Sequence, residues 1–470
     1  MTTIGILPLG RPTFDVPFAE EVKAAALSNL AGSDAEVVGS TDLLLDGEAT
    51  DGAIAALRER ELDLLLILQV TFTDADAIQR AAREIDAPIA LWAFPEDRTG
   101  GRLRLNSFCG INLAAHALAD IGRTAEHLYR PADDPGVLDE LRTILQVRPA
   151  RGADWEPSRR PDALPAPAVA TATEVRDRLR DVRVGAVGDH PDGFHPCRYD
   201  AEALRSTVGA EVERLELDEL FATARQVGPE RRAQLRERVG AALTGVDDVD
   251  QEALGATLDT YAALRSLADE RGWSGVAVRC WPEMFTEQGG AACAAMAMMT
   301  DEEVPAACER DVNGNVTEVA LSALAGDVPA FIADLVDLDV GEGTGVLWHC
   351  GLAPLSMADP DTPPRAGLHS NRQKPLVHEF ALRPGRITIA RLHESPDGLG
   401  IVLGSGEMIS APPSFSGTSG VVRFDGDAGR ILATIVERGL EHHYAFVYAD
   451  IRDEVRALAA LWDLPVLELA

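Results

Sequence analysis

The segment Leu62-Asp63-Leu64-Leu65-Leu66-Ile67-Leu68-Gln69 indicates the fold class of the first part of the chain. Its apolar run has the length of a strand and lacks polar alternation, which is typical of strands buried on both faces of a parallel sheet. The expected strands around it are Ile4–Leu9, Ala35–Val38 and Ile89–Phe94, and the expected helices are Phe18–Leu30, Asp51–Arg60 and Asp74–Glu84. This alternation predicts a parallel sheet covered by helices on both faces.

A proline-rich stretch from Pro149 to Pro167 follows this first unit and is typical of a linker or an extended crossing segment. A second α/β pattern begins after it, with expected strands Val182–Val187, Gly275–Cys280 and Val304–Cys308, long helical patterns from about Leu217 to Glu270, and a helix at Asn315–Leu324. Past about Asp327 the expected strands are short and separated by Pro-Gly, Asp-Gly and Gly-Ser turns: Val377–Leu382, Arg386–His393, Gly400–Ser405 and Val421–Phe424. That pattern predicts antiparallel β structure, a barrel or a sandwich.

The predicted fold class is therefore α/β, with two doubly wound parallel-sheet domains followed by a C-terminal antiparallel β-barrel-like domain. The predicted domains are residues 1–160, residues 161–326, which carry Glu309, and residues 327–470, which carry Asp334 and His443. A chain of 470 residues has the length of about three domains.

The composition of the chain limits the kinds of partner and the cellular location that we expect. The formal net charge of −33 argues against nucleic acid and against anionic membranes as partners. No apolar stretch reaches the length of a membrane span, and the N-terminus begins directly in a strand without a basic signal region. We therefore expect a cytoplasmic protein. The six cysteines form no CxxC pair, which favours small apolar core residues.

Four apolar runs in the last third of the chain end in oxygen or imidazole donors. The donors are Glu309, Asp334, His349 and the pair His442-His443. Carboxylates and imidazoles together suit one divalent cation, and the absence of a thiolate from the set favours Mn²⁺, with other divalent cations as alternatives. Adjacent histidines point to opposite faces of a strand, so we expect at most one of the pair to face a given pocket.

Three of these four positions also have a purely structural interpretation. Asp311 or Asn313 could cap the helix that follows Glu309. Asp334 could be a surface acid, and His349 could be a core histidine. Only the four donors considered together favour a metal site.

Three further residues follow strands in positions that suit a ligand. Arg11 comes directly after the first strand, Phe72 follows the strand ending at Gln69, and Trp281 follows the strand ending at Cys280. Aromatic planes beside polar groups are suited to the CH face of a sugar, although such residues also occur in cores and at pocket rims.

The ordered set Glu309, Asp334, His349 and His442-His443 resembles the metal-dependent L-fucose/L-arabinose isomerase superfamily. Supporting motifs lie along most of the chain: Arg104–Gly110, Val187–Phe194, Glu379–Gly385 and Pro413–Gly420. The resemblance implies that Glu309 and Asp334 are metal ligands and acid/base groups, and that His443 is an imidazole ligand. In the arabinose-type branch a further histidine binds the metal, and His349 occupies its place. Asp334 after an alanine matches the fucose type instead, so the chain mixes features of both branches.

The resemblance also implies substrate contacts from Arg11 and Phe72, and we expect Trp281, His349 and His442 to line the same pocket. Family pockets are completed by a neighbouring subunit, which implies a homotrimer or homohexamer with shared active sites. The implied function is aldose–ketose isomerisation of a fucose- or arabinose-like sugar, or of a C6-modified hexose such as a deoxy or sulfo sugar. The reaction would pass through a metal-stabilised enediolate, or through a hydride shift on the same ligands. Two alternatives stay open: a metal-dependent hydrolase or lyase, and a non-catalytic sugar-binding protein.

Overall fold

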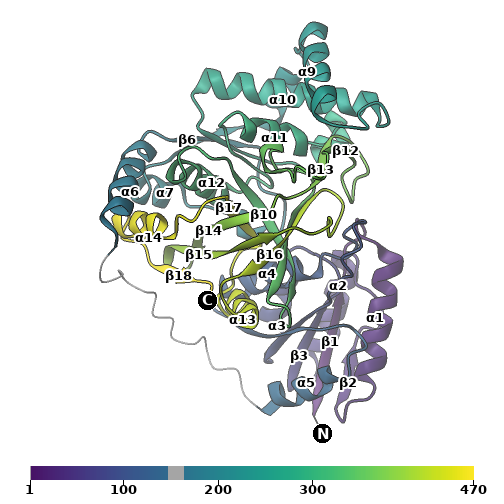
Figure 1. Ribbon diagram of the computed structural model, residues 1–470. Coiled ribbons are helices and arrows are strands. Elements are labelled where there is room, and N and C mark those ends of the chain that lie inside the picture. The colour runs from purple at the N-terminus through teal and green to yellow at the C-terminus, as the bar shows by residue number, and fades with distance from the viewer. Residues whose placement is uncertain (1, 147–163) are drawn as a thin grey trace.

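The computed structural model describes residues 2–146 and 164–470, and within them the strands form three sheets (Figure 1). The first sheet has the order β2-β1-β3-β4-β5, and every pair in it is parallel. Its strands are β1 (Thr3–Leu9), β2 (Glu36–Gly39), β3 (Leu64–Gln69), β4 (Ile89–Ala93) and β5 (Ala125–Tyr129). Its helices are α1 (Val16–Leu30), α2 (Gly47–Arg58), α3 (Asp76–Glu84), α4 (Ser107–Ala119) and α5 (Gly136–Gln146). Strand β3 is buried along its whole length, as its sequence predicts.

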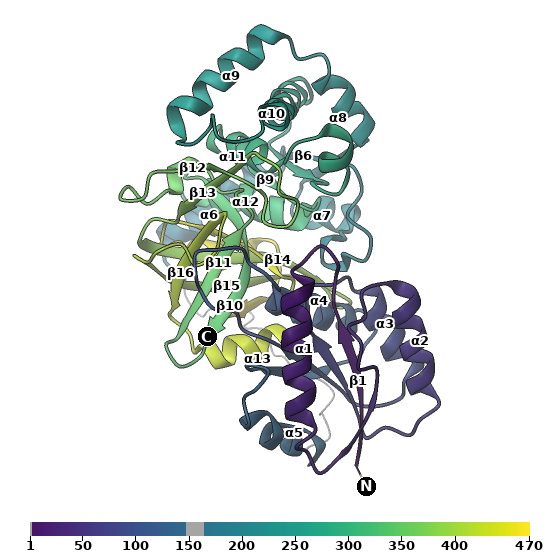
Figure 2. The ribbon, with the colours of Figure 1, turned by 90° about the vertical axis from the view of Figure 1, so that its right-hand side faces the viewer.

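The second sheet is also parallel, with the order β7-β6-β8-β9. Its strands are β6 (Arg183–Val187), β7 (Glu211–Leu215), β8 (Gly275–Val278) and β9 (Ala306–Ala307). Its helices are α6 (Ala166–Leu179), α7 (Ala201–Thr207), α8 (Leu217–Ala224), α9 (Pro229–Ala242), α10 (Gln251–Arg271), α11 (Cys293–Asp301) and α12 (Val312–Leu324). The long helical pattern after Leu217 is thus three helices, which lie at the end of the molecule away from the first sheet (Figure 2).

The third sheet closes on itself. Strands β16-β11-β10-β17-β14-β15 are antiparallel neighbours, and β15 also pairs with β16. These strands are β10 (Ala330–Asp339), β11 (Thr344–His349), β14 (Gly385–Ser395), β15 (Gly398–Ile409), β16 (Thr418–Phe424) and β17 (His443–Val447). Strands β12 (Arg365–Gly367), β13 (Val377–Ala381) and β18 (Val466–Glu468) extend it, and helices α13 (Ala428–Arg438) and α14 (Arg452–Leu461) pack outside. The predicted α/β class with a C-terminal antiparallel barrel is confirmed.

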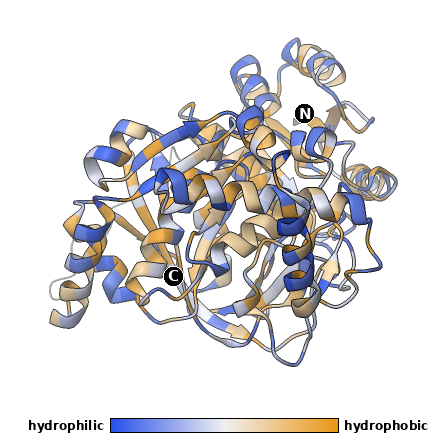
Figure 3. Ribbon diagram, turned by 90° about the horizontal axis from the view of Figure 1, so that it is seen from above, coloured by the Kyte–Doolittle hydropathy of each residue, from blue (hydrophilic) through white to orange (hydrophobic). Residues whose placement is uncertain are grey.

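Two buried helices join the three sheets. Helix α4 contacts β3, β4 and β5 on one side and β10 and α13 on the other. Helix α12 contacts β8 and β9 of the second sheet and β10, β14 and β17 of the barrel. Both are buried on nearly every residue, so their sequences are mostly apolar, and their polar side chains, such as Asn315 and Glu318 of α12, are buried as well. In Figure 3 the apolar residues gather in the central strands and inner helices, while the outer helices carry most hydrophilic positions.

The proline-rich stretch expected as a linker falls largely on residues 147–163, which lie outside the described residues. Its end is described: Pro165 precedes helix α6. Among the helices that the structure describes, none has the length and apolarity needed to span a membrane.

A buried acid in α12 gives a prediction on stability. Glu318 accepts hydrogen bonds from Asn315 Nδ2 and Ile332 N, at 3.2 and 3.0 Å, and burial raises its pKa to about 8. Between the ordinary pKa of 4.5 and pH 8, Glu318 is ionised in the unfolded chain but still protonated in the folded chain. The free energy of unfolding therefore falls by about 1.4 kcal/mol per pH unit over this range. We expect Glu318→Gln to be free of this decrease in stability with pH. The melting temperature of the variant should exceed that of the wild type by several degrees at pH 8 and by little at pH 5. A difference in melting temperature that does not depend on pH would contradict the argument.

Candidate active site

One pocket collects the residues that the sequence singles out from all three sheets. It encloses about 690 Å³, including the part open to solvent, and its wall contains six of them: Arg11, Phe72, Trp281, Glu309, Asp334 and His349. His442 and His443 lie directly behind Glu309, at 3.1 and 3.7 Å from its Oε2.

Glu309 lies in the turn between β9 and α12. Both Glu309 and Arg310 have a φ of 55°, a left-handed conformation that is uncommon for residues with a side chain. The Trp281 Nε1–H donates to Glu309 Oε1 at 3.2 Å, and His442 Nε2 lies 3.1 Å from Oε2. Burial raises the pKa of Glu309, but the hydrogen bond from His442, the charges of His442 and His443, and the Trp281 bond outweigh it and lower the pKa to about 2. The side chain is therefore an anion in this environment.

Asp311 caps helix α12 and also holds His443. Its Oδ1 accepts the Gly314 N–H at 2.9 Å, so the capping interpretation of this stretch is correct for Asp311. Its Oδ2 lies 2.9 Å from His443 Nδ1 and contacts Arg391. Burial raises the pKa of Asp311, but Arg391 and His443 outweigh it and the net pKa is lowered. A carboxylate beside Nδ1 places the imidazole proton there and leaves the lone pair of Nε2 free.

Asp334 lies in the middle of a strand, so its expected position at a strand end is wrong. Strand β10 continues to Asp339 because it pairs with β11 through an irregularity between Leu335 and Asp337. Asp334 stands opposite His443 in the β10–β17 pair, and its Oδ1 lies 3.4 Å from His443 Nε2. This oxygen has no hydrogen-bond partner among the described residues. Burial, helped by the charge of Glu309, raises the pKa of Asp334 to about 6.

His443 is the donor that approaches both carboxylates: its Nε2 lies 3.7 Å from Glu309 Oε2 and 3.4 Å from Asp334 Oδ1. Its ligand atoms lie within 4.8 Å of those of Asp334 and His442 in one group, and of those of Glu309 and Cys197 in another. Two carboxylates and one imidazole of fixed tautomer are a donor set suited to a hard or borderline divalent ion. The carboxylate on the far nitrogen is the usual support of a metal-binding histidine. The buried, unpaired oxygen of Asp334 is the atom that a cation would satisfy.

His349 lies beside this set with a different orientation. Its Nδ1 accepts the Cys350 N–H at 2.8 Å, so the proton of a neutral ring is on Nε2, which faces Cys308 Sγ at 2.7 Å. A protonated Nε2 offers no lone pair to a metal. This geometry favours a place in the pocket wall, where the His349 ring is parallel to Trp348, with centroids 6.1 Å apart.

The paired histidines do not alternate about Glu309 as two strand residues would, because both approach its carboxylate from behind the pocket wall. Strand β17 begins at His443, so His442 precedes it and does not follow strand alternation. The two rings lie 4.0 Å apart, and both imidazoles approach Glu309. His442 also packs on Phe72 with centroids 5.6 Å apart. Burial lowers the pKa of His442, but the hydrogen bond and charge of Glu309 outweigh it and raise the pKa above its ordinary value.

Sequence reasoning missed the charged network behind the site. Arg391 is fully buried in β14, where it contacts Asp311 and lies 3.8 Å from Glu441 Oε2. Glu441 in turn lies 2.8 Å from His393 Nδ1. The signal was an arginine in the middle of the apolar run 387–392, since a charge at a core position needs buried partners.

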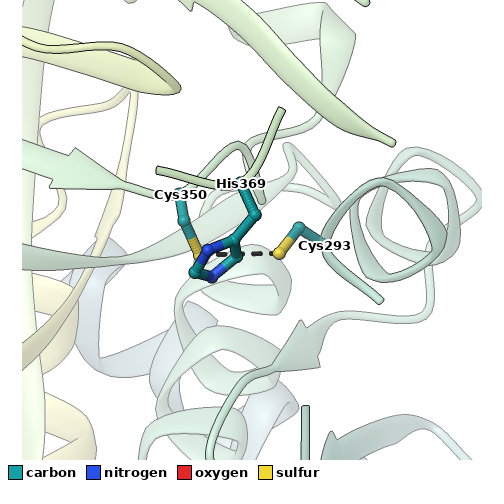
Figure 4. A group of neighbouring side chains, drawn as sticks. All are labelled: Cys293, Cys350 and His369. Atoms are coloured by element: carbon teal, nitrogen blue, oxygen red, sulfur yellow. Dashed lines mark hydrogen bonds between the residues drawn. The ribbon is translucent and has the colours of Figure 1, made fainter. Parts of the chain in front are cut away.

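A second missed group lies in the loop between β12 and β13. Figure 4 shows His369 of this loop close to Cys293 and Cys350, whose sulfurs lie 3.5 Å apart. His369 Nδ1 accepts the N–H groups of Asn371 and Arg372 at 3.2 and 3.3 Å, and burial lowers its pKa to about 3. The neutral ring therefore fixes the conformation of the loop. All six cysteines are free and buried, as expected.

Comparisons with known proteins agree with this architecture. The N-terminal domain model of fucose/sulfoquinovose isomerase matches residues 5–147. A sulfoquinovose isomerase of Clostridium sp. (strain MSTE9) is 30% identical over 460 residues, 97% of this chain and 96% of the relative. Sulfoquinovose isomerases of Alkalicoccus urumqiensis and Priestia megaterium are 27% identical, with 100% and 98% of each chain covered.

The protein is therefore an intramolecular oxidoreductase of the aldose–ketose isomerase class, as the sequence predicts. More particularly, the chain belongs to the fucose/sulfoquinovose isomerase family, within the L-fucose/L-arabinose isomerase superfamily that its motifs resemble.

Proposed function

We propose that this enzyme converts a C6-sulfonated aldohexose into its 2-ketose, with a divalent cation held by Glu309, Asp334 and His443. Its relatives are named for sulfoquinovose, a glucose with a sulfonate on C6, and they match almost the whole chain. The observation that carries the metal site is the buried, unpaired Asp334 Oδ1, which faces the free nitrogen of His443. Mn²⁺ is the first choice of ion because the donors are two carboxylates and one imidazole.

The residues supply the proton movements that the reaction needs. Isomerisation moves a proton from C2 to C1 and another from O2 to O1, and the sugar gains and loses no electrons overall. Glu309 and Asp334 share these transfers: one takes the C2 proton and returns it to C1, and the other serves O1 and O2. A bound divalent cation would supply Lewis-acid polarisation of the sugar carbonyl.

The surrounding side chains hold these groups in place. His442 and Trp281 each hydrogen-bond one oxygen of Glu309, which fixes the plane of its carboxylate. Asp311 orients His443. Phe72 and the rings of His349 and Trp281 would face the CH groups of the sugar. The expected homotrimer or homohexamer with shared sites and the cytoplasmic location stay predictions.

Metal removal tests this proposal. We expect chelator-treated enzyme to lose at least about 100-fold in turnover of sulfoquinovose and to recover it with Mn²⁺, because carbonyl polarisation contributes several kcal/mol. The readout is formation of the ketose at unchanged mass, with metal content measured in the same samples. Sulfoquinovose turnover that persists in metal-free protein would refute the metal site. Mn²⁺-loaded protein without this isomerisation would refute the substrate.

A further inference from the structure

Two arginines line the pocket. Arg11 follows β1 and Arg372 lies in the loop before β13, and both are partly buried in the pocket wall. They are cations in a chain whose formal net charge is −33, so their position is not a consequence of a generally basic surface.

Neither arginine has a strong internal partner. The nearest carboxylate oxygen to Arg11 is Asp74 Oδ2 at 4.0 Å, and that side chain is 41% exposed. No carboxylate among the described residues lies within ion-pair distance of Arg372. Burial lowers the pKa of Arg11; the charges of Asp74 and Glu309 oppose this effect without outweighing it, and repulsion from Arg372 adds to it. Burial likewise lowers the pKa of Arg372. Two partly desolvated guanidinium groups, one paired only with a half-exposed carboxylate at 4.0 Å and the other with no carboxylate within ion-pair distance among the described residues, are a site for an anion.

Trp281 connects these arginines to the reacting end of the pocket. Its ring centroid lies 5.0 Å from Arg11 Cζ and 5.9 Å from Arg372 Cζ, while its Nε1–H donates to Glu309. A single indole thus separates the proposed acid/base group from the two cations. An open-chain hexose that places C1 and C2 at Glu309 and extends along this indole carries its C6 substituent toward the guanidinium groups.

The loop that carries Arg372 is held firmly. Arg102 donates to Asn371 Oδ1 and to Thr13 O, each at 3.0 Å, which ties the loop to the segment containing Arg11. His369 accepts the backbone N–H of Arg372, as described above. The two arginines are therefore presented by segments joined to one another, and the site needs little rearrangement to bind an anion.

We propose that Arg11 and Arg372 bind the sulfonate of the substrate and determine specificity for a sulfonated over an uncharged hexose. This inference rests on the proposed function for the identity of the sugar. The planar guanidinium groups would donate hydrogen bonds to the three equivalent sulfonate oxygens, which carry their negative charge at every physiological pH.

The test uses a ligand that binds without reacting. The sugar alcohol made by reducing sulfoquinovose keeps the sulfonate but has no carbonyl to isomerise, and D-glucitol is its uncharged counterpart. We expect the Mn²⁺-loaded wild type to bind the sulfonated alcohol at least about 10-fold more tightly than glucitol by calorimetry. Arg372→Gln should lose most of this preference and leave glucitol binding unchanged.

A matched control removes the same charge elsewhere. Arg205→Gln changes an exposed arginine of α7 that pairs with Glu202, and its preference should equal that of the wild type. A wild type that does not prefer the sulfonated alcohol, or an Arg372→Gln variant that keeps the preference, would overturn the inference. If the preference depends on Arg372 but sulfoquinovose is not isomerised, the anion site stands and the proposed reaction fails.

Discussion

Replacing Glu309 by glutamine is expected to lower kcat by at least about 100-fold, the lower range for the loss of a general acid–base group. Glutamine keeps the size of the side chain and can still accept a hydrogen bond from Trp281 Nε1–H. It removes the negative charge that His442 and His443 face at 3.1 and 3.7 Å. We therefore expect weaker Mn²⁺ binding together with the loss of turnover, measured by titration of metal-free protein and by the ketose assay.

A control with another glutamate separates this effect from a general loss of charge. Glu394 is partly buried and accepts hydrogen bonds from Asn313 and from the Asp200 backbone, outside the pocket. Glu394→Gln should stay within about threefold of wild-type turnover, as expected of a residue that makes no contact with the reacting groups. Near-native turnover of Glu309→Gln at saturating Mn²⁺ would remove Glu309 from the reaction.

Replacing Arg391 by methionine is expected to cost about 3–5 kcal/mol of folding free energy. The arginine is fully buried, and its removal leaves the carboxylates of Asp311 and Glu441 in the interior without their cation. Asp311 would lose the charge that lowers its pKa, so His443 should also be held less firmly. Denaturant unfolding measures the first effect, and Mn²⁺ affinity of the folded fraction measures the second.

The same strand supplies the control for this variant. Arg386 of β14 pairs with Asp425 and Asp450 at the surface, and its side chain is 30% exposed. Arg386→Met should cost less than about 1 kcal/mol, because exposed ion pairs contribute little. Equal losses of folding free energy in the two variants would mean that burial does not increase the contribution of the Arg391 ion pairs to stability.

Local patterns predicted the elements well where one physical signal dominates. The buried run 64–68 and its neighbours gave the first parallel sheet, with boundaries within a few residues. The turn-separated short strands after Asp327 gave the barrel. Asp334 was misplaced at a strand end because a carboxylate in an apolar run is normally a terminator, and only its pairing with His443 shows why the strand continues.

The candidate site was assembled from the sequence only in part. Glu309, Asp334 and His443 were identified as strand-associated donors, and the structure places both carboxylates within 3.7 Å of His443 Nε2. The sequence analysis did not single out Arg391 or Arg372, because neither arginine lies in a recognisable motif. The role of Arg391 depends on Asp311 and Glu441, 80 and 50 residues away along the chain, and the role of Arg372 depends on its place beside Trp281.

The sequence by itself determined the α/β class, the C-terminal barrel, the enzyme family and the chemical types of the donor residues. Those properties follow from periodicity and residue identity, which are local. Only the tertiary structure decided that Asp311 orients His443, that both adjacent histidines reach Glu309, and that two arginines share the indole of Trp281. These are contacts between distant segments, and their geometry depends on how α4 and α12 pack the three sheets together.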